Sequence, residues 1–210
     1  LPIAMIALMV ISAFAVMIYH LPYGESAGAY DVSVSVDNAS KEVAAGSTIT
    51  FQITIKNEGT NADRYNLNMT VAKSPSTWQH TLSQTSTGQI SSGASLTGII
   101  VQVRAPSTGV DISSYCYVTI KVTSQTDAKN STASVLLTAL IKRSYGVSIS
   151  DPGIKRMNPG GSVVYSFNVK NEGNDQDGYQ LEAVTVPTGF SASVNFDTGK
   201  FAAGSTKAAT

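Results

Sequence analysis

The sequence contains few histidines and cysteines, the side chains that most often act as catalysts or metal ligands. It contains two histidines, His20 and His80, and one cysteine, Cys116. A histidine metal cluster or a Ser-His-Asp triad needs an imidazole beside a second ligand or a nucleophile, and His20 belongs to an apolar N-terminal segment. The sequence has no Gly-x-Ser-x-Gly motif and no phosphate-binding loop. We therefore expect no catalytic residue, no cofactor and no enzymatic activity.

One group of carboxylates resembles the start of a calcium loop. The run Asn174-Asp-Gln-Asp-Gly178 has oxygen-bearing side chains at alternate positions, with Asp175 and Asp177 as the candidate ligands. The glutamate that would close such a loop is missing at the required spacing, and the related run Thr60-Asn-Ala-Asp-Arg64 has a different composition. A solvated turn is the simpler interpretation of this run.

Aromatic residues offer a second kind of site, a stacking platform for a sugar ring. Trp78, Tyr115 and Tyr117 are the only members we would assign to it. Trp78 is the single tryptophan and is expected to cover the core instead. Cys116 alternates with the two tyrosines along a strand-like run, so we expect it to be a buried apolar residue and the tyrosines to lie on the opposite face.

Three Asn-x-Ser/Thr triplets are candidate glycosylation sites, at Asn38, Asn68 and Asn130. Asn130 lies in the polar run 125–132, which is typical of a turn. Asn68 lies within a strand-like run and is expected to point outward. A chain rich in Asn, Ser and Thr also forms such triplets by chance, so modification depends on the host.

The elements that must position these residues begin after an apolar segment. Residues 1–19 carry no charge and are long enough to span a bilayer as a helix, and they also resemble the core of a secretory signal. A small-residue cleavage pattern, Ala27-Gly28-Ala29, precedes Tyr30. Residues 1–29 are thus a signal peptide or a membrane anchor helix, and both export the remaining chain. The sequence starts with Leu, so we expect the natural N-terminus to lie upstream.

Apolar and polar residues alternate through residues 30–142, which is typical of half-buried strands. The expected strands are 32–36, 49–55, 65–71, 78–82, 96–103, 116–122 and 135–141. Strands at this spacing, separated by turn residues, predict an all-β fold, a seven-stranded immunoglobulin-like Greek-key sandwich.

Part of this pattern occurs twice. Residues 46–67 and 160–181 match at a constant offset of 114, including Lys56-Asn-Glu-Gly59 with Lys170-Asn-Glu-Gly173. The spacing is that of a whole small β domain. We interpret Asn-Glu-Gly as a strand end in which glycine takes a positive φ.

The repeat divides the chain into two modules, 30–142 and 143–210, joined by a very short linker. In the second module we expect the first three strands and then a strand at Phe190–Phe196. By analogy with the first module, it ends at Thr210 in the turn before the next strand, so we expect it to be truncated. A half sandwich would expose its inner face and an open edge.

Composition narrows the classes of partner. The formal net charge is zero and 13% of the residues are charged. A nucleic-acid binder needs a basic face to displace phosphate counterions, so we expect no nucleic-acid partner.

The runs Gly46–Gly59 and Tyr65-x-Leu67, then Val101–Pro106 and the tyrosine-rich strand Tyr115–Val122, resemble the NPCBM-associated and CARDB-type domains. The second copy, Pro159–Gly173, is the cleaner match. These are tandem β-sandwich modules of archaeal and bacterial surface proteins. The resemblance implies a spacer, stalk or adhesion module and supplies no catalytic residue.

The sequence therefore predicts a non-enzymatic, exported cell-surface protein that acts as stalk, spacer or adhesion element. Its expected partners are neighbouring modules, other surface proteins or glycans, and the membrane if residues 1–19 are retained. Two alternatives stay open. One is the accessory region of a secreted hydrolase or protease whose catalytic domain lies beyond residue 210, and the other is a carbohydrate-binding module.

Overall fold

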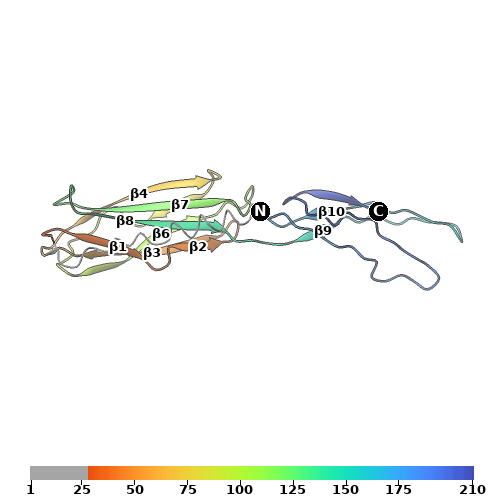
Figure 1. The fold of residues 1–210 in the computed structure, drawn as a ribbon, viewed down its shortest axis with the longest axis horizontal. Coiled ribbons are helices and arrows are strands. Elements are labelled where there is room, and N and C mark those ends of the chain that lie inside the picture. Colours follow the sequence, from red (N-terminus) through yellow and green to blue (C-terminus); the bar gives the residue numbers. More distant parts are fainter. Residues whose placement is uncertain (1–27) are drawn as a thin grey trace, which may run out of the picture.

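The computed structural model describes residues 28–210. The apolar segment in which we expect a signal peptide or an anchor lies outside the described residues, apart from its last two. Within residues 28–210 the regular elements are all strands, and no helix there is long and apolar enough to cross a membrane. The described chain is elongated, with two β modules placed end to end (Figure 1).

The strands follow one another in the order β1 (Val32–Val36), β2 (Ser40–Val43), β3 (Thr48–Asn57), β4 (Tyr65–Ser74), β5 (Gln79–Leu82), β6 (Ser95–Arg104), β7 (Tyr115–Ser124), β8 (Thr132–Ile141), β9 (Val147–Ile149), β10 (Phe167–Asn171) and β11 (Thr206–Ala209). Strands β1 to β8 form the first module and β9 to β11 form the second.

The first module is a sandwich of two four-stranded sheets. One sheet has the order β1-β3-β6-β5 and the other has the order β2-β8-β7-β4. Alternate residues of each strand face the space between the sheets, as the sequence pattern predicts. Phe51, Ile53 and Ile55 of β3 are fully buried there, opposite Val118 and Ile120 of β7. The all-β sandwich expected from the sequence is confirmed.

The first module has eight strands rather than the predicted seven, because β2 was not predicted. Strand β2 pairs in parallel with β8, whereas β1 pairs antiparallel with β3 in the opposite sheet. The chain thus changes sheets between Val36 and Ser40. The run Ser-Lys-Glu-Val offers a single apolar residue, Val43, so alternation could not reveal this strand.

The second module repeats the central pairing of the first. Lys170 of β10 pairs with Thr206 of β11, as Lys56 of β3 pairs with Ser95 of β6. Strand β11 is therefore the counterpart of β6, and the chain reaches it before residue 210. The expectation that the chain ends in the preceding turn is wrong.

Two strands expected in the second module do not form. Residues 179–181 and 190–196 are irregular, although Asn195 and Thr210 exchange two backbone hydrogen bonds. In the first module β4 is held along its whole length by β7. Among the described residues, 179–188 have no pairing partner of this kind and are not in a strand.

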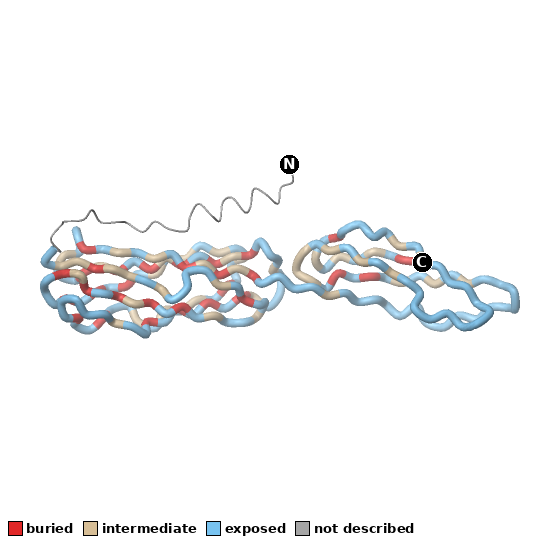
Figure 2. Tube along the Cα trace, turned by 60° about the horizontal axis from the view of Figure 1, so that its bottom comes forward, coloured by how far each residue is buried: buried red, intermediate tan, exposed pale blue. Residues whose placement is uncertain are grey.

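The second module accordingly has a small core. Three residues, Val169, Phe201 and Ala209, are buried in it. Val147 and Ile149 of β9 are half exposed, and so is Phe190. Figure 2 shows buried residues throughout the first module and few in the second.

Candidate functional site

The repeated Asn-Glu-Gly motif forms a closed hydrogen-bonded turn, which we call the Asn clasp. In the first module the side chain of Asn57 is fully buried at the end of β3. Its Nδ2 donates to the carbonyl oxygens of Asn61 and Ile90, both at 2.9 Å, and its Oδ1 accepts from the Gly59 amide at 2.9 Å. One asparagine therefore satisfies three backbone groups from separate parts of the chain.

The second module contains the same clasp. Asn171 Nδ2 donates to the carbonyl oxygens of Asp175 at 2.8 Å and Phe201 at 3.1 Å, and its Oδ1 accepts from the Gly173 amide at 2.9 Å. The tyrosines that follow also match. Tyr65 Oη donates to the Asp31 carbonyl, and Tyr179 Oη donates to the Gly146 carbonyl. The sequence repeat therefore encodes a repeated hydrogen-bond network, and this accounts for its conspicuous identity.

The glycine of the clasp is required for close approach and not for a positive φ. A Cβ on Gly59 would lie 2.7 Å from both the Ala29 carbonyl oxygen and the Asp31 amide nitrogen. On Gly173 it would lie 2.8 Å from the Ser144 carbonyl oxygen. Neither glycine has a left-handed backbone, so the predicted positive φ is wrong at both positions.

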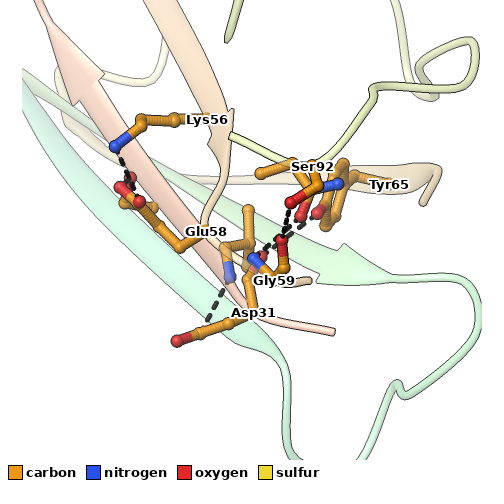
Figure 3. Close-up of polar contacts among 9 residues, drawn as sticks. Asp31, Lys56, Glu58, Gly59, Tyr65 and Ser92 are labelled. Carbon is orange, nitrogen blue, oxygen red and sulfur yellow. Dashed lines mark hydrogen bonds and ion pairs between the residues drawn. The ribbon is translucent and has the colours of Figure 1, made fainter. Parts of the chain in front are cut away.

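Polar contacts fasten the outside of the first clasp (Figure 3). The Asp31 carbonyl accepts from the amides of Glu58 and Gly59, and Ser92 Oγ donates to the Gly59 carbonyl at 2.7 Å. Lys56 pairs with Glu58 at 2.7 Å, and this hydrogen bond lowers the pKa of the Glu58 carboxyl. The clasp joins the start of the module to its centre, so its role is structural.

The clasp of the second module also holds the linker. Asn174, next to Gly173, bonds to the linker through three groups. Its Oδ1 accepts from the Ser144 amide at 2.8 Å, its Nδ2 donates to the Lys142 carbonyl at 2.9 Å, and its own amide donates to the Ser144 carbonyl at 3.2 Å. The Asn174 carbonyl then accepts from the Ile112 amide of the first module at 3.3 Å. A single residue thus contacts both modules and the segment between them.

An ion pair adds to this contact. Arg143 Nη2 lies 3.0 Å from Asp175 Oδ2. A hydrogen bond with Tyr145 and the charge of Asp175 raise the pKa of the Arg143 guanidinium. We call Arg143, Asn174 and Asp175, with their contacts, the junction lock.

Sequence reasoning missed the junction lock as a functional feature. The sequence did contain a signal for it, because the two copies of the repeat differ at the positions that form the junction lock. Thr60 and Asn61 stand where the second module has Asn174 and Asp175. Positions that differ within an otherwise matching repeat indicate a role that only one module has.

The two candidate metal ligands, Asp175 and Asp177, make different contacts in the structure. Asp175 faces Arg143 across the linker, and Asp177 Oδ1 accepts from the Gly178 amide at 2.8 Å. Within the described part of the chain, no three His, Cys, Asp or Glu side chains gather in a way that could hold a metal ion. The expectation that this run is a solvated turn and not a calcium site stays a prediction, and one of the two candidate carboxylates, Asp175, is paired with Arg143.

The aromatic candidates also separate. Trp78 is buried, with its Nε1 donating to the Ser74 carbonyl at 3.2 Å, so its expected role in the core is confirmed. Tyr115 and Tyr117 lie on the outer face of β7, with ring centroids 4.5 Å apart and stacked on each other. Cys116 is fully buried between the sheets, and burial raises the pKa of its thiol.

The three glycosylation candidates are all exposed. Asn38 lies in the turn between β1 and β2, where its Oδ1 accepts from the Ser40 amide at 3.1 Å. Asn68 points outward from the middle of β4. Asn130 precedes β8, and its Nδ2 lies 3.1 Å and 3.2 Å from the two carboxylate oxygens of Asp127. Glycosylation at these residues stays a prediction.

Comparison with known proteins identifies neither a family nor a function. No family model matches the sequence, so the NPCBM-associated or CARDB-type resemblance is not confirmed, and no curated protein matches it. Among solved structures, the chain is similar to the ASH/PapD-like domain 7 of human CEP192, with 13% identity over 60% of this chain and 95% of that chain and a TM-score of 0.38.

Two further similar structures come from other kinds of protein. Domains 4 and 5 of the S-layer protein SbsC share 22% identity over 53% of each chain, with a TM-score of 0.33. The secreted serine protease VesC from Vibrio cholerae shares 15% identity over 85% of this chain and 43% of that chain, with a TM-score of 0.38. Likeness at this level carries no conclusion about activity or partners.

Proposed function

We propose that this chain is an exported, non-enzymatic surface protein whose tandem immunoglobulin-like modules act as a spacer or stalk. The single observation that carries the proposal is the junction lock. Arg143, Asn174 and Asp175 fix the linker to the second module, and the Asn174 carbonyl reaches the first module at Ile112. A spacer requires modules that keep their relative orientation, and this contact provides it.

The sequence supports the location. The uncharged run 1–19 is suited to a signal peptide or an anchor, and three sequons lie on exposed positions of the first module. Adhesion to other surface proteins or to glycans is the finer form of the same proposal. A platform of three aromatic residues gains no support, because Trp78 is buried.

The lock can be tested by pulsed electron paramagnetic resonance on the full chain. Nitroxide labels at Thr70→Cys in β4 and Asn168→Cys in β10 report the distance between modules, since both positions are exposed. Cys116 stays in place because it is buried and its thiol pKa is raised. We expect a narrow distance distribution that widens in the double variant Asn174→Ala, Asp175→Ala.

The matched control is Asn61→Ala, which lies in the corresponding turn of the first module and should leave the distribution unchanged. A wide distribution in the unmodified chain would contradict the spacer proposal. Peptide mapping of separated membrane, cell-surface and medium fractions tests export independently, and recovery from the cell interior alone would contradict that part.

A further inference from the structure

The end of the first module that faces the second contains a polar hollow outside the features described above. Its volume is about 320 Å³, at the lower end of the range for small-molecule sites. It lies where β6 ends at Arg104 and β5 begins at Gln79, two residues that pair across the sheet. We call it the Arg104 pocket.

Backbone hydrogen bonds hold the base of the pocket. The Gly46 amide donates to the Pro106 carbonyl at 2.9 Å, and the Ala105 amide donates to the Ser47 carbonyl at 3.0 Å. Gly46 has a φ of 74°, which turns the chain between β2 and β3 toward this loop. A Cβ placed on Gly46 would lie 3.4 Å from Ser107 Cβ, so the two loops pack closely.

The same turn orients the charged side chain. Arg104 Nε donates to the Gly46 carbonyl at 3.3 Å. This bond uses one of the five guanidinium N–H donors and leaves four on the two Nη atoms. Within residues 28–210, no ion pair is formed by Arg104, since the five salt bridges there involve other residues.

The pocket lining is mostly polar and contains no acidic residue. Beside the guanidinium it presents hydroxyl and amide groups, from Thr77, Gln79, Ser107 and Thr108, over the apolar surface of Ala105 and Pro106. A guanidinium with free Nη donors pairs well with a planar carboxylate, and the surrounding groups exchange hydrogen bonds with alcohols.

We propose that the Arg104 pocket binds a carboxylate-bearing sugar, such as a uronic acid residue of an acidic polysaccharide. Arg104 binds the carboxylate through its Nη donors, and Gln79 with the three hydroxyl side chains bonds to the ring hydroxyls. The volume suits one sugar ring. This inference concerns the first module alone and does not depend on the spacer proposal.

The test is a titration of the isotope-labelled full chain followed by NMR. The probes are trigalacturonic acid, its methyl ester, which has the same rings without charge, and acetate, which has the charge without the ring. We expect the acid to shift the amide signals of Thr77, Gln79 and Ser107. The ester and acetate should each bind at least roughly tenfold more weakly, because each lacks one part of the recognised group.

Two variants make the assignment specific. Arg104→Gln should weaken acid binding by roughly tenfold or more and leave the fold intact, because Arg104 is exposed. Arg64→Gln, an exposed arginine just before β4, should bind like the parent. Equal binding of acid and ester, equal binding of acetate, or undiminished binding by Arg104→Gln would each overturn the proposal.

Discussion

Asn57 and Asn171 each provide two donors and one acceptor to backbone groups of the surrounding turns and loops. Both are fully buried, so water cannot replace these bonds. A buried polar group without a partner costs about 1–3 kcal/mol. At the residue scale, then, the repeat is explained by the need to satisfy the same turn twice.

We expect Asn57→Ala to lower the free energy of unfolding of the first module by about 1–3 kcal/mol. The variant removes three hydrogen bonds and leaves the Asn61 carbonyl without a partner among the described residues, while the Ile90 carbonyl and the Gly59 amide keep their bonds to Asp63 and Asp31. Chemical denaturation followed by Trp78 fluorescence measures the change. Asn61→Ala, at an exposed side chain of the same turn, should stay within about 0.5 kcal/mol of the parent. A loss in Asn57→Ala as small as that of the control would show that the clasp is dispensable.

Gly59→Ala should destabilise the first module by about 1–3 kcal/mol, because the new methyl group meets backbone atoms at 2.7 Å that cannot move aside independently. Gly88→Ala is the matched control. Nothing lies within 4 Å of its added Cβ, and its φ is not left-handed. The control should be neutral or stabilising by up to about 1 kcal/mol. Thermal melts measure both variants, and a loss in Gly59→Ala no larger than that in Gly88→Ala would contradict the close-approach explanation.

At the scale of elements, the change of sheets between β1 and β2 is held by Asp37. Its Oδ1 accepts from the Gln52 amide at 3.0 Å, and its Oδ2 lies 2.7 Å from Lys41 Nζ. Lys41 also donates to the Thr50 carbonyl and lies 5.0 Å from the Phe51 ring centroid. This group ties the crossing segment to β3, so the short polar strand β2 reaches β8 in a fixed register.

Hydrogen bonds from Lys41 and from the Gln52 amide lower the pKa of Asp37 to about 2, from an ordinary value of 3.8. A carboxyl with a lower pKa in the folded state stabilises the fold above pH 3.8 and loses this contribution as pH falls toward 2. We expect Asp37→Asn to be less stable than the parent at neutral pH and to have a shallower loss of stability across this range. Urea denaturation midpoints from pH 6 to 2 measure it. Parallel pH curves for the two proteins would contradict the role given to Asp37.

The sequence was sufficient for the long strands and insufficient where a neighbour decides the structure. Strands β3, β6 and β7 alternate over ten residues each, so their buried faces could be predicted. Strand β2 exists because Asp37 and β8 hold it, and within residues 28–210 the segment 179–181 has no pairing partner like the one that β7 provides to β4. The role of Gly59 depends on how closely the start of the module approaches, which no local pattern records.

Candidate sites follow the same rule. Cys116 was placed correctly because strand alternation determines which side is buried, and Trp78 was placed correctly because a single large aromatic residue is expected to cover a core. The junction lock and the Arg104 pocket combine residues from loops far apart in sequence, such as Ile112 with Asn174, or Gly46 with Arg104. Only the assembled fold brings these groups together.

At the scale of the whole molecule, the two modules share a pattern of backbone hydrogen bonds and differ in the size of their hydrophobic cores. The first core contains 20 buried residues and the second contains three. Hydrophobic burial is the main favourable term in folding, so the modules differ greatly in the energy that holds them closed. Within residues 28–210, the junction lock therefore connects a part with a large core to a part with a small one.

Two equivalent amides can measure this difference. The Asn57 amide donates to the Ala94 carbonyl at 3.0 Å, and the Asn171 amide donates to the Ser205 carbonyl at the same distance. Both residues are fully buried. We expect the Asn171 amide to exchange with solvent deuterium at least roughly 100-fold faster, because opening the second module requires less free energy. NMR-detected hydrogen exchange on the full chain gives both rates in one experiment.

Equal exchange rates of the two amides would contradict the idea that each module's own core sets its stability. They would mean that contacts through the junction with the first module stabilise the second. Asn174→Ala separates these cases. If each core sets its own stability, the variant leaves the Asn57 rate unchanged and raises the Asn171 rate only slightly, because it removes two side-chain bonds to the linker. If the junction carries the support, the variant exposes Asn171 to rapid exchange while Asn57 stays protected.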